Sequence, residues 1–321
     1  MGNTKGYVDP LLTALTVDYS KGVREKLIGS RLFPRVKVPK SSGKFARFDK
    51  GNIMRVVDDT LAEDGFSRKL PYGGTMEPYS TDERGLSDDY DLADASQREG
   101  PFALKDQQIV ERIVTQLEIN QESRIAAKVA ALDGRATALA GVGAAKANKF
   151  AYTSANTGGD PFTAISDGIK ACFWRPNLMI IADSVFDALE YHPILLAKLG
   201  EANMIKKVDE DTLAKLFRVQ KVVRAEGKAD FGKPKADGSL NLTNLWGNSV
   251  IIAYVDERPD FPCAGKTLAV DYPEADSAGY IVRAWDEERA GLRGKRVVQV
   301  GYDVDELVVC PELIYTISSC I

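Results

Sequence analysis

The chain has 321 residues, of which 44% are hydrophobic and 27% are charged; this is the composition of a folded protein and excludes a wholly disordered or collagenous chain. Its 42 basic and 46 acidic residues give a formal net charge of −4, so the chain as a whole lacks the positive charge expected of a nucleic-acid clamp. No run of 18 apolar residues appears and no secretory signal is visible, so we expect no membrane span and no membrane partner.

The near-neutral total hides two blocks of opposite charge at the N-terminal end. Residues 1–48 contain ten basic and three acidic side chains, whereas residues 49–103 contain six basic and thirteen acidic ones. Within the basic block, residues 32–39 alternate valine with basic residues between two prolines, which favours an edge strand or extended arm. Residues 43–52 predict a strand that leads into a turn. Residues 61–100 are polar and rich in turn formers, and they lack the apolar surface for a core of their own.

A long helix is predicted from Leu104 to about Leu132, because apolar residues recur there at a spacing of three to four, or twice that, until Gly134 ends the run. About 28 residues at 1.5 Å each span roughly 40 Å, which suits the backbone of an elongated subunit. The apolar positions are Ile109, Ile113, Leu117, Ile125, Val129 and Leu132. The charged side chains of this helix, which we expect to stay solvated, are Arg112, Glu118, Glu122 and Arg124.

After a small-residue linker at 135–160, the pattern becomes a mixture of helices and strands. Helices are predicted at 162–173, at 184–189 with Asp183 as the N-cap, and at 211–217. Strands are predicted at 177–182, 219–225, 248–255, 280–285, 295–302, 306–309 and 315–317, and residues 226–245 predict an exposed hairpin or loop. Because no βαβ repeat runs through the chain, we predict an α+β fold with one very long helix and a separate mixed domain.

Signals of catalysis are weak. The single histidine, His192, precedes a proline and is expected to be a structural residue at a junction between two helices. The four cysteines have no metal-ligand spacing, which favours buried free thiols, and they are Cys172, Cys263, Cys310 and Cys320. Neither a nucleophile elbow nor a phosphate-binding loop appears. We therefore predict no catalytic, cofactor-binding or metal residues, although counting alone does not exclude an acid/base pair of carboxylates.

Several segments, taken in their order along the chain, carry a resemblance. Residues 176–193, PNLMIIADSVFDALEYHP, join an apolar strand to a helix that ends in His-Pro. YSTDERGLSDD at 79–89 precedes the long helix, which itself contains LE at 117–118 and ESRIAA at 122–127. LAKLFRV at 213–219 is followed by LWGN at 245–248. Over nearly the whole chain, these segments resemble the major capsid proteins of tailed bacteriophages, which have the Hong Kong ninety-seven fold.

The resemblance implies a layout of five parts. These are an N-terminal arm at 1–42, an extended loop at 43–88 that reaches over a neighbour as a long hairpin, a peripheral domain with the spine helix at 89–165, an axial domain at 166–300, and C-terminal strands at 301–321 that return to the peripheral domain. Family members often begin with a long, cleavable scaffolding segment. The spine helix already begins near residue 104 here, so either a separate scaffolding protein assists or that segment was removed.

The resemblance also implies a structural subunit and not an enzyme. Hexamers and pentamers of many copies would close into an icosahedral virion head around double-stranded DNA, after assembly in the host cytoplasm. Separate scaffolding, decoration and portal proteins are the further partners that it allows. Two alternatives stay open: the shell of an encapsulin-type nanocompartment, and a monomeric hydrolase that uses buried carboxylates.

The two charged blocks lead to a hypothesis about assembly. The basic arm and the acidic loop would lie against complementary surfaces on adjacent subunits and so set register and orientation. The alternative is that both blocks are merely solvated, since an exposed ion pair contributes only about 0–1 kcal/mol. A basic cluster formed by Arg289, Arg293, Lys295 and Arg296 could touch DNA, but a loop or interface patch is the favoured interpretation.

Overall fold

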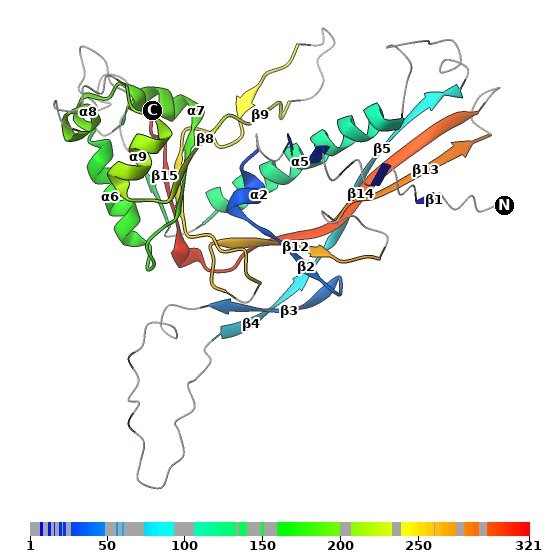
Figure 1. The fold of residues 1–321 in the computed structure, drawn as a ribbon, viewed down its shortest axis with the longest axis horizontal. Helices are drawn as coiled ribbons and strands as arrows, with labels where there is room; N and C mark the ends of the chain where they lie inside the picture. Colours follow the sequence, from blue (N-terminus) through cyan, green and yellow to red (C-terminus); the bar gives the residue numbers. More distant parts are fainter. Residues whose placement is uncertain are drawn as a thin grey trace.

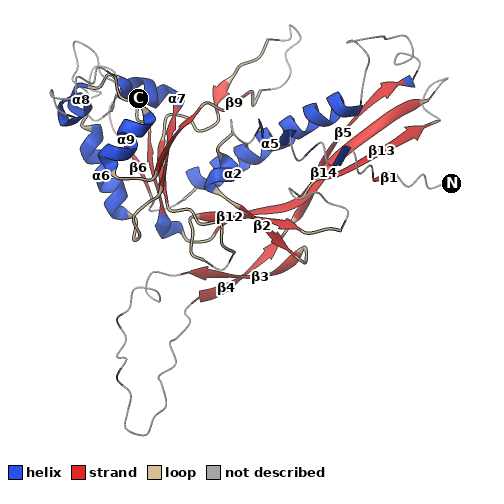
Figure 2. Cartoon of the chain, in the orientation of Figure 1, coloured by secondary structure: helices blue, strands red, loops and turns tan. Residues whose placement is uncertain are grey.

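The computed structural model describes residues 7–8, 12–13, 16, 19–20, 22–23, 27–48, 56, 60, 74–92, 106–132, 135–139, 149–150, 159–199, 207–232, 239–259, 261–273, 279–288 and 294–321. They form two main sheets, one long helix, a group of shorter helices on the second sheet, and a two-stranded hairpin that projects from the body (Figures 1 and 2). None of the helices in these ranges has both the length and the apolarity to cross a membrane.

The six-stranded sheet is organised around one long strand, β14 (Lys295–Val308). On one side β14 pairs with β5 (Asp82–Asp91), and on the other it pairs with β13 (Ile281–Glu287) and then with β12 (Gly265–Val270). The outer strands β1 (Tyr7–Val8) and β2 (Arg35–Val38) pair with β13 and β12 respectively. The prediction of an edge strand within residues 32–39 is therefore confirmed.

The helix α5 (Asp106–Ala130) lies along one face of this sheet (Figure 1), and the prediction of one long helix is confirmed. Its N-terminal half packs Ile109, Val110, Ile113, Val114 and Leu117 against apolar residues of β13 and β14. Even-numbered residues of β14, from Val298 to Glu306, are buried on this face. Because side chains alternate along a strand, the odd-numbered residues point to the opposite face.

The five-stranded sheet has the order β6 (Ala136–Ala138), β15 (Ile314–Ser318), β11 (Val250–Ala253), β7 (Leu178–Ala182) and β8 (Lys221–Ala225). Every residue of β7 and β11 is buried, as the continuous apolar runs predict. One face is covered by α6 (Pro161–Ala171), α7 (Asp183–Glu190), α8 (Pro193–Leu199) and α9 (Glu210–Phe217). The other face packs against α2 (Gly29–Leu32) and the C-terminal part of α5.

Two of the short helices begin at an aspartate cap, but α7 does not. Asp160 accepts hydrogen bonds from the backbone N–H groups of Phe162 and Thr163, and Asp209 accepts one from Thr212. Asp183, the predicted N-cap of α7, is instead the first residue of the helix. The cap position is occupied by Ala182, whose side chain makes no capping hydrogen bond. The carboxylate of Asp183 pairs with Arg224 of β8 at 2.5 Å, so an ion pair between elements replaces the cap.

The C-terminal strands differ from the prediction in one respect. The segments predicted at 295–302 and 306–309 form one continuous strand. Asp303, a charged residue between them, stays within the strand and accepts a hydrogen bond from Tyr272. The strands that follow residue 260 are divided between the two main sheets. β12, β13 and β14 belong to the six-stranded sheet, whereas β15 pairs with β11 and belongs to the five-stranded one.

Two hairpins leave the body. β3 (Ser42–Phe48) and β4 (Gly74–Ser80) pair with each other and, among the described strands, with none of either main sheet. In Figure 1 they lie below the six-stranded sheet. β9 (Lys228–Ala229) and β10 (Thr243–Asn244) form the second hairpin, within the excursion predicted at 226–245. The short 3₁₀ helix η4 (Pro311–Leu313) joins β14 to β15.

The core between the two layers gives a stability prediction. Ile252 of β11 is 0% exposed and packs against the helices of the five-stranded sheet, so Ile252→Ala should lower the free energy of unfolding by about 2–5 kcal/mol. Chemical denaturation followed by tryptophan fluorescence measures this loss. Leu240 is 69% exposed, so the matched variant Leu240→Ala should change stability by no more than about 0.5 kcal/mol. Equal effects of the two variants would contradict this account of the core.

Candidate functional site

The side chains that sequence reasoning considered for catalysis are buried and separate. His192 is 0% exposed and stands between α7 and α8, and burial lowers the pKa of its imidazole despite the opposing charge of Asp160. All four cysteines are buried free thiols, as predicted. Burial raises the pKa of Cys172 and Cys263 to about 11, so little reactive thiolate exists near neutral pH. In the ranges that the structure describes, no group of three or more metal-binding side chains occurs.

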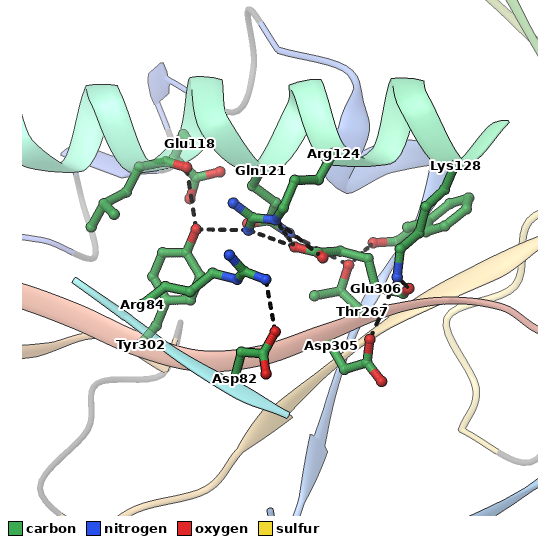
Figure 3. A network of polar contacts seen from close by, with 12 residues as sticks. Asp82, Arg84, Glu118, Gln121, Arg124, Lys128, Thr267, Tyr302, Asp305 and Glu306 are labelled. Carbon is green, nitrogen blue, oxygen red and sulfur yellow. Dashed lines mark hydrogen bonds and ion pairs between the residues drawn. The ribbon is translucent and has the colours of Figure 1, made fainter. Parts of the chain in front are cut away.

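The most developed polar arrangement lies between α5 and the strands that it covers (Figure 3). We call it the polar seam, and it consists of Glu118, Gln121, Glu122, Arg124 and Lys128 of α5 with their partners. Glu118 and Glu122 are only 3% and 2% exposed. The prediction that the charged residues of this helix stay solvated is therefore wrong for Glu118, Glu122 and Arg124. It holds for Arg112, which is largely exposed and pairs with Asp88 of β5.

Arg124 and Glu306 form the central ion pair of the seam. The Arg124 guanidinium donates to both carboxylate oxygens of Glu306, with a shortest N–O distance of 2.6 Å, and it also donates to the Tyr302 hydroxyl at 3.1 Å. Burial acts to lower the pKa of Arg124, but the hydrogen bonds and charges of Glu306 and Tyr302 together outweigh it, and the pKa is raised. A two-pronged pair of this kind fixes both distance and orientation, so it sets how α5 sits on β14.

Lys128 extends the same contact one turn further along the helix. Its ammonium group donates to the backbone carbonyl of Glu306 and lies 3.5 Å from the Asp305 carboxylate. Burial raises the pKa of Asp305, and the charge of Lys128 opposes this shift. The last two turns of α5 are thus bound to consecutive residues of β14.

Glu122 joins three parts of the chain that are distant in sequence. One of its carboxylate oxygens accepts from the backbone N–H groups of Ile28 and Gly29, at 2.9 and 3.4 Å. The other accepts from the indole N–H of Trp246 at 2.6 Å. Glu122 therefore ties the start of α2 and the turn before β11 to the middle of α5. Burial raises the pKa of Glu122, and the hydrogen bonds from the three donors oppose this shift without cancelling it. The carboxylate is therefore held in place at a cost in desolvation.

Arg35 connects the N-terminal segment to the same seam. Its guanidinium donates to the Gln121 side chain at 2.6 Å and lies about equally far from the rings of Tyr280 and Tyr302, at 5.5 and 5.6 Å. Tyr280 in turn donates to Glu118 at 2.6 Å. The strand β2, and with it the start of the projecting hairpin, is thereby anchored on α5.

The β3–β4 hairpin contrasts with the seam because it has no core. None of its described side chains is buried, and Met76 is 59% exposed. Its base is nevertheless well defined: Tyr79 covers Gly43 so closely that a Cβ there would lie 2.7 Å from the ring, and its hydroxyl donates to the Lys40 carbonyl. Among its described residues, Arg47 and Glu77 form an ion pair across the two strands at 2.7 Å.

The chain resembles known proteins over most of its length, although no protein-family model matches it. It is 28% identical over 304 residues to the major capsid protein of Burkholderia phage BcepMu, covering 89% of this chain and 93% of that protein. It is 23% identical over 320 residues to the major capsid protein of Pseudomonas phage JBD67, covering 98% and 97%. This chain is a phage major capsid protein.

Solved structures agree on the fold. The capsid subunit superposes on a phage-related protein from Bordetella bronchiseptica with a TM-score of 0.71 at 20% identity, covering 99% of this chain and 98% of that one. On the capsid of cyanophage P-SCSP1u the TM-score is 0.51 at 11% identity, covering 89% and 86%. The predicted α+β Hong Kong ninety-seven fold is confirmed. As a capsid protein the chain is structural and not an enzyme, so the hydrolase alternative is wrong.

The seam was missed at the sequence level, although the capsid sequence contains a signal for it. The apolar pattern of α5 skips from Leu117 to Ile125, twice the usual spacing, and Gln121 stands halfway between them. Since residues four apart share a helix face, Gln121 had to face inward if both neighbours did. Glu118 and Glu122 follow Leu117 and Gln121 on the adjoining edge of that face, and both are buried.

The raised pKa of Glu122 gives a prediction about pH. The folded state binds a proton at Glu122 more tightly than the unfolded chain, whose ordinary value is 4.5. The contribution of Glu122 to the free energy of unfolding is therefore fully present below pH 4.5, and it is lost as the pH rises through the raised pKa. Glu122→Gln cannot titrate, so the wild type should lose stability relative to this variant over that window, as measured by denaturation at several pH values.

Glu111→Gln on the same helix serves as the control, because Glu111 is partly exposed and lies outside the seam. Parallel pH profiles for the wild type and Glu122→Gln would contradict the assignment.

Proposed function

We propose that many copies of this subunit, grouped as hexamers and pentamers, close into the icosahedral head around double-stranded DNA. The observation that carries the proposal is the β3–β4 hairpin, which projects from the body without a buried side chain. An isolated two-stranded hairpin is marginally stable at best in water, and ordering each residue costs roughly 1–2 kcal/mol. Contact with a neighbouring subunit offsets that cost, so the hairpin fits a subunit of a shell better than a monomer.

The layout of the head subunit is part of this proposal. Residues 1–42 form the arm, residues 43–88 form the extended loop, and residues 89–165 contribute the spine helix to the peripheral domain. The strand pairing supports placing 265–308 with the peripheral domain, because β12, β13 and β14 lie in the sheet beneath α5. The remaining residues from 166 onward, including β15, then form the axial domain.

The complementary-charge hypothesis remains a proposal for the contacts between subunits. Part of each charged block is used inside the subunit: Lys37 pairs with Asp271 at 2.7 Å, and Lys295 pairs with Asp89 at 2.6 Å. Exposed lysines remain on the β3 side of the hairpin, and Lys44 is one of them. We propose that such residues, and not the whole blocks, meet acidic surfaces on adjacent subunits.

The basic cluster near β14 fits an internal role better than contact with DNA. Arg296 pairs with Asp106 and Asp286, both at 3.1 Å, and Lys295 is also paired. Arg289 and Arg293 lie outside the described residues. The slightly acidic total charge also suits a container, since a strongly basic wall would bind phosphates and hinder movement of DNA during packaging. Assembly in the host cytoplasm with separate scaffolding, decoration and portal proteins completes the proposal.

Truncation of the loop tests the proposed function. Phe48 and Gly74 lie directly opposite each other, so residues 49–73 can be replaced by a two-residue Asn-Gly turn. The shortened subunit should keep its free energy of unfolding to within about 1 kcal/mol but lose most of its particle yield, because the body has its own core. Electron microscopy and light scattering, with nucleic-acid detection, measure the particles.

The wild-type subunit, produced in the same way, is the control and should form closed particles. A wild-type chain that stays monomeric under all assembly conditions would refute the shell.

A salt series tests the charge hypothesis. If lysines of the hairpin meet acidic surfaces, the assembly yield should fall as ionic strength rises from about 0.05 to 0.5 M, where the screening length becomes a few Å. Lys44→Gln should weaken that salt dependence, whereas Lys170→Gln, an exposed lysine of α6, should not. A yield that is constant across the series would contradict the role of charge.

A further inference from the structure

The single histidine of the chain, His192, is bound through its backbone to two helices at once. Its N–H donates to the carbonyl of Leu189 in α7 at 3.1 Å, and its own carbonyl accepts from the N–H of Leu196 in α8 at 3.1 Å. Only Tyr191 and His192 separate the two helices, and Pro193, the first residue of α8, has a fixed φ angle. The backbone around His192 therefore moves only if the ends of both helices move.

The side chain of His192 is enclosed in the helix layer of the five-stranded sheet. His192 is 0% exposed, and so are Leu189 and Leu195, which flank it and belong to the apolar cluster beneath α7 and α8. The preceding residue, Tyr191, is 58% exposed. The junction thus lies close to the surface, so a local displacement is enough to bring the imidazole to water.

The charged groups near the junction leave an imidazolium poorly compensated. On the described elements around it they are Asp160 at the start of α6, Glu190 at the end of α7, Lys198 of α8, and Lys207 and Asp209 before α9. Glu190 is paired with Lys207, and Asp160 caps α6. The charge of Asp160 acts to raise the pKa of His192, but burial has the larger effect and the pKa is lowered.

We propose that protonation of His192 opens the junction between α7 and α8, so that this helix layer loosens reversibly in mild acid while the sheet beneath α5 stays folded. A buried imidazolium has a high desolvation cost, which is relieved when the ring reaches water. The apolar cluster beneath α7 and α8 shares no residue with the cluster between α5 and β13–β14, so one layer can open without the other. The opening takes place within one subunit and does not depend on contacts between subunits.

The direction of the effect follows from the two states of the junction. In the open junction the imidazole has its ordinary pKa of 6.5, whereas in the closed junction it binds a proton more weakly. The closed junction is therefore fully favoured above pH 6.5 and loses stability as the pH falls below that value. Since one proton is involved, the ratio of open to closed junctions rises by at most about tenfold for each pH unit.

Hydrogen exchange of the full-length subunit tests the proposal, when rates are corrected for the intrinsic effect of pH on amide exchange. Between about pH 7.5 and pH 5.5, the amides of α7 and α8 should exchange roughly three- to tenfold faster and become less protected than residues 109–117 of α5. His192→Gln cannot take up a proton and should remove this acceleration. Unchanged exchange in the wild type, acceleration that persists in His192→Gln, or equal protection of both layers in acid would overturn the proposal.

A second measurement covers the case in which His192→Gln does not fold. Because the chain has one histidine, carbon-13 in the histidine ring gives a single nuclear magnetic resonance signal, which should titrate below pH 6.5 in the wild type. Acceleration of exchange in α7 and α8 should end at the pH at which this signal titrates. A ring that titrates at or above 6.5 would contradict the opening by protonation.

Two matched variants identify the charge that acts on the ring. Asp160→Asn removes the negative charge but keeps an oxygen that can cap α6, so it should lower the pKa of the His192 ring further. Asp209→Asn makes the same change at the cap of α9 and should leave the ring titration as it is. Equal titration curves for Asp160→Asn and the wild type would count against the proposed surroundings of His192.

Discussion

Burial of polar side chains beneath the spine helix is the constraint on which the rest of this subunit depends. Leaving one buried carboxylate or guanidinium without a partner would cost about 1–3 kcal/mol or more. Each of these groups on α5 therefore needs one particular partner. Arg124 finds Glu306, and Glu122 finds two backbone N–H groups and the Trp246 indole. Apolar contacts alone would tolerate sliding of the helix along the sheet, whereas this set of hydrogen bonds specifies one register.

The same contacts explain how a projection without a core is held in place. The hairpin follows β2, whose Arg35 lies in the seam, and it is followed by β5. Every residue of β5 pairs with β14. Both roots of the hairpin are therefore attached to the sheet that α5 covers. A contact made by the hairpin with a neighbouring subunit would act on the body through these two strands.

The two faces of the six-stranded sheet serve different purposes. The even-numbered residues of β14 face α5 and build the subunit, because they are apolar or paired with the helix. The odd-numbered residues include Gly301 and Asp303, which line a hollow on the opposite face. A strand that alternates in this way can satisfy its own fold with one set of side chains and present the other set to the opposite face.

Much of this fold could be predicted from local pattern. The apolar spacing predicted the long helix, the continuous apolar runs predicted β7 and β11, and the prolines around residues 32–39 indicated an edge strand. These features depend on neighbours within a few residues, so the sequence itself contains them. The order of several short segments was enough to indicate the capsid family, even though no single segment would have been.

Only the tertiary structure decided where the polar groups lie. The partner of Arg124 is 182 residues away and that of Glu122 is 124 residues away, so no local pattern shows that these charges are buried. The pairing of Gly85 with Gly301, and of Glu83 with Asp303, depends on strands that meet across more than two hundred residues of sequence. Sequence alone determined which elements form and to which family they belong. Contact between distant elements determined which charges are buried and paired within the subunit and which stay exposed, because burial is a property of the packed surfaces and not of the residue.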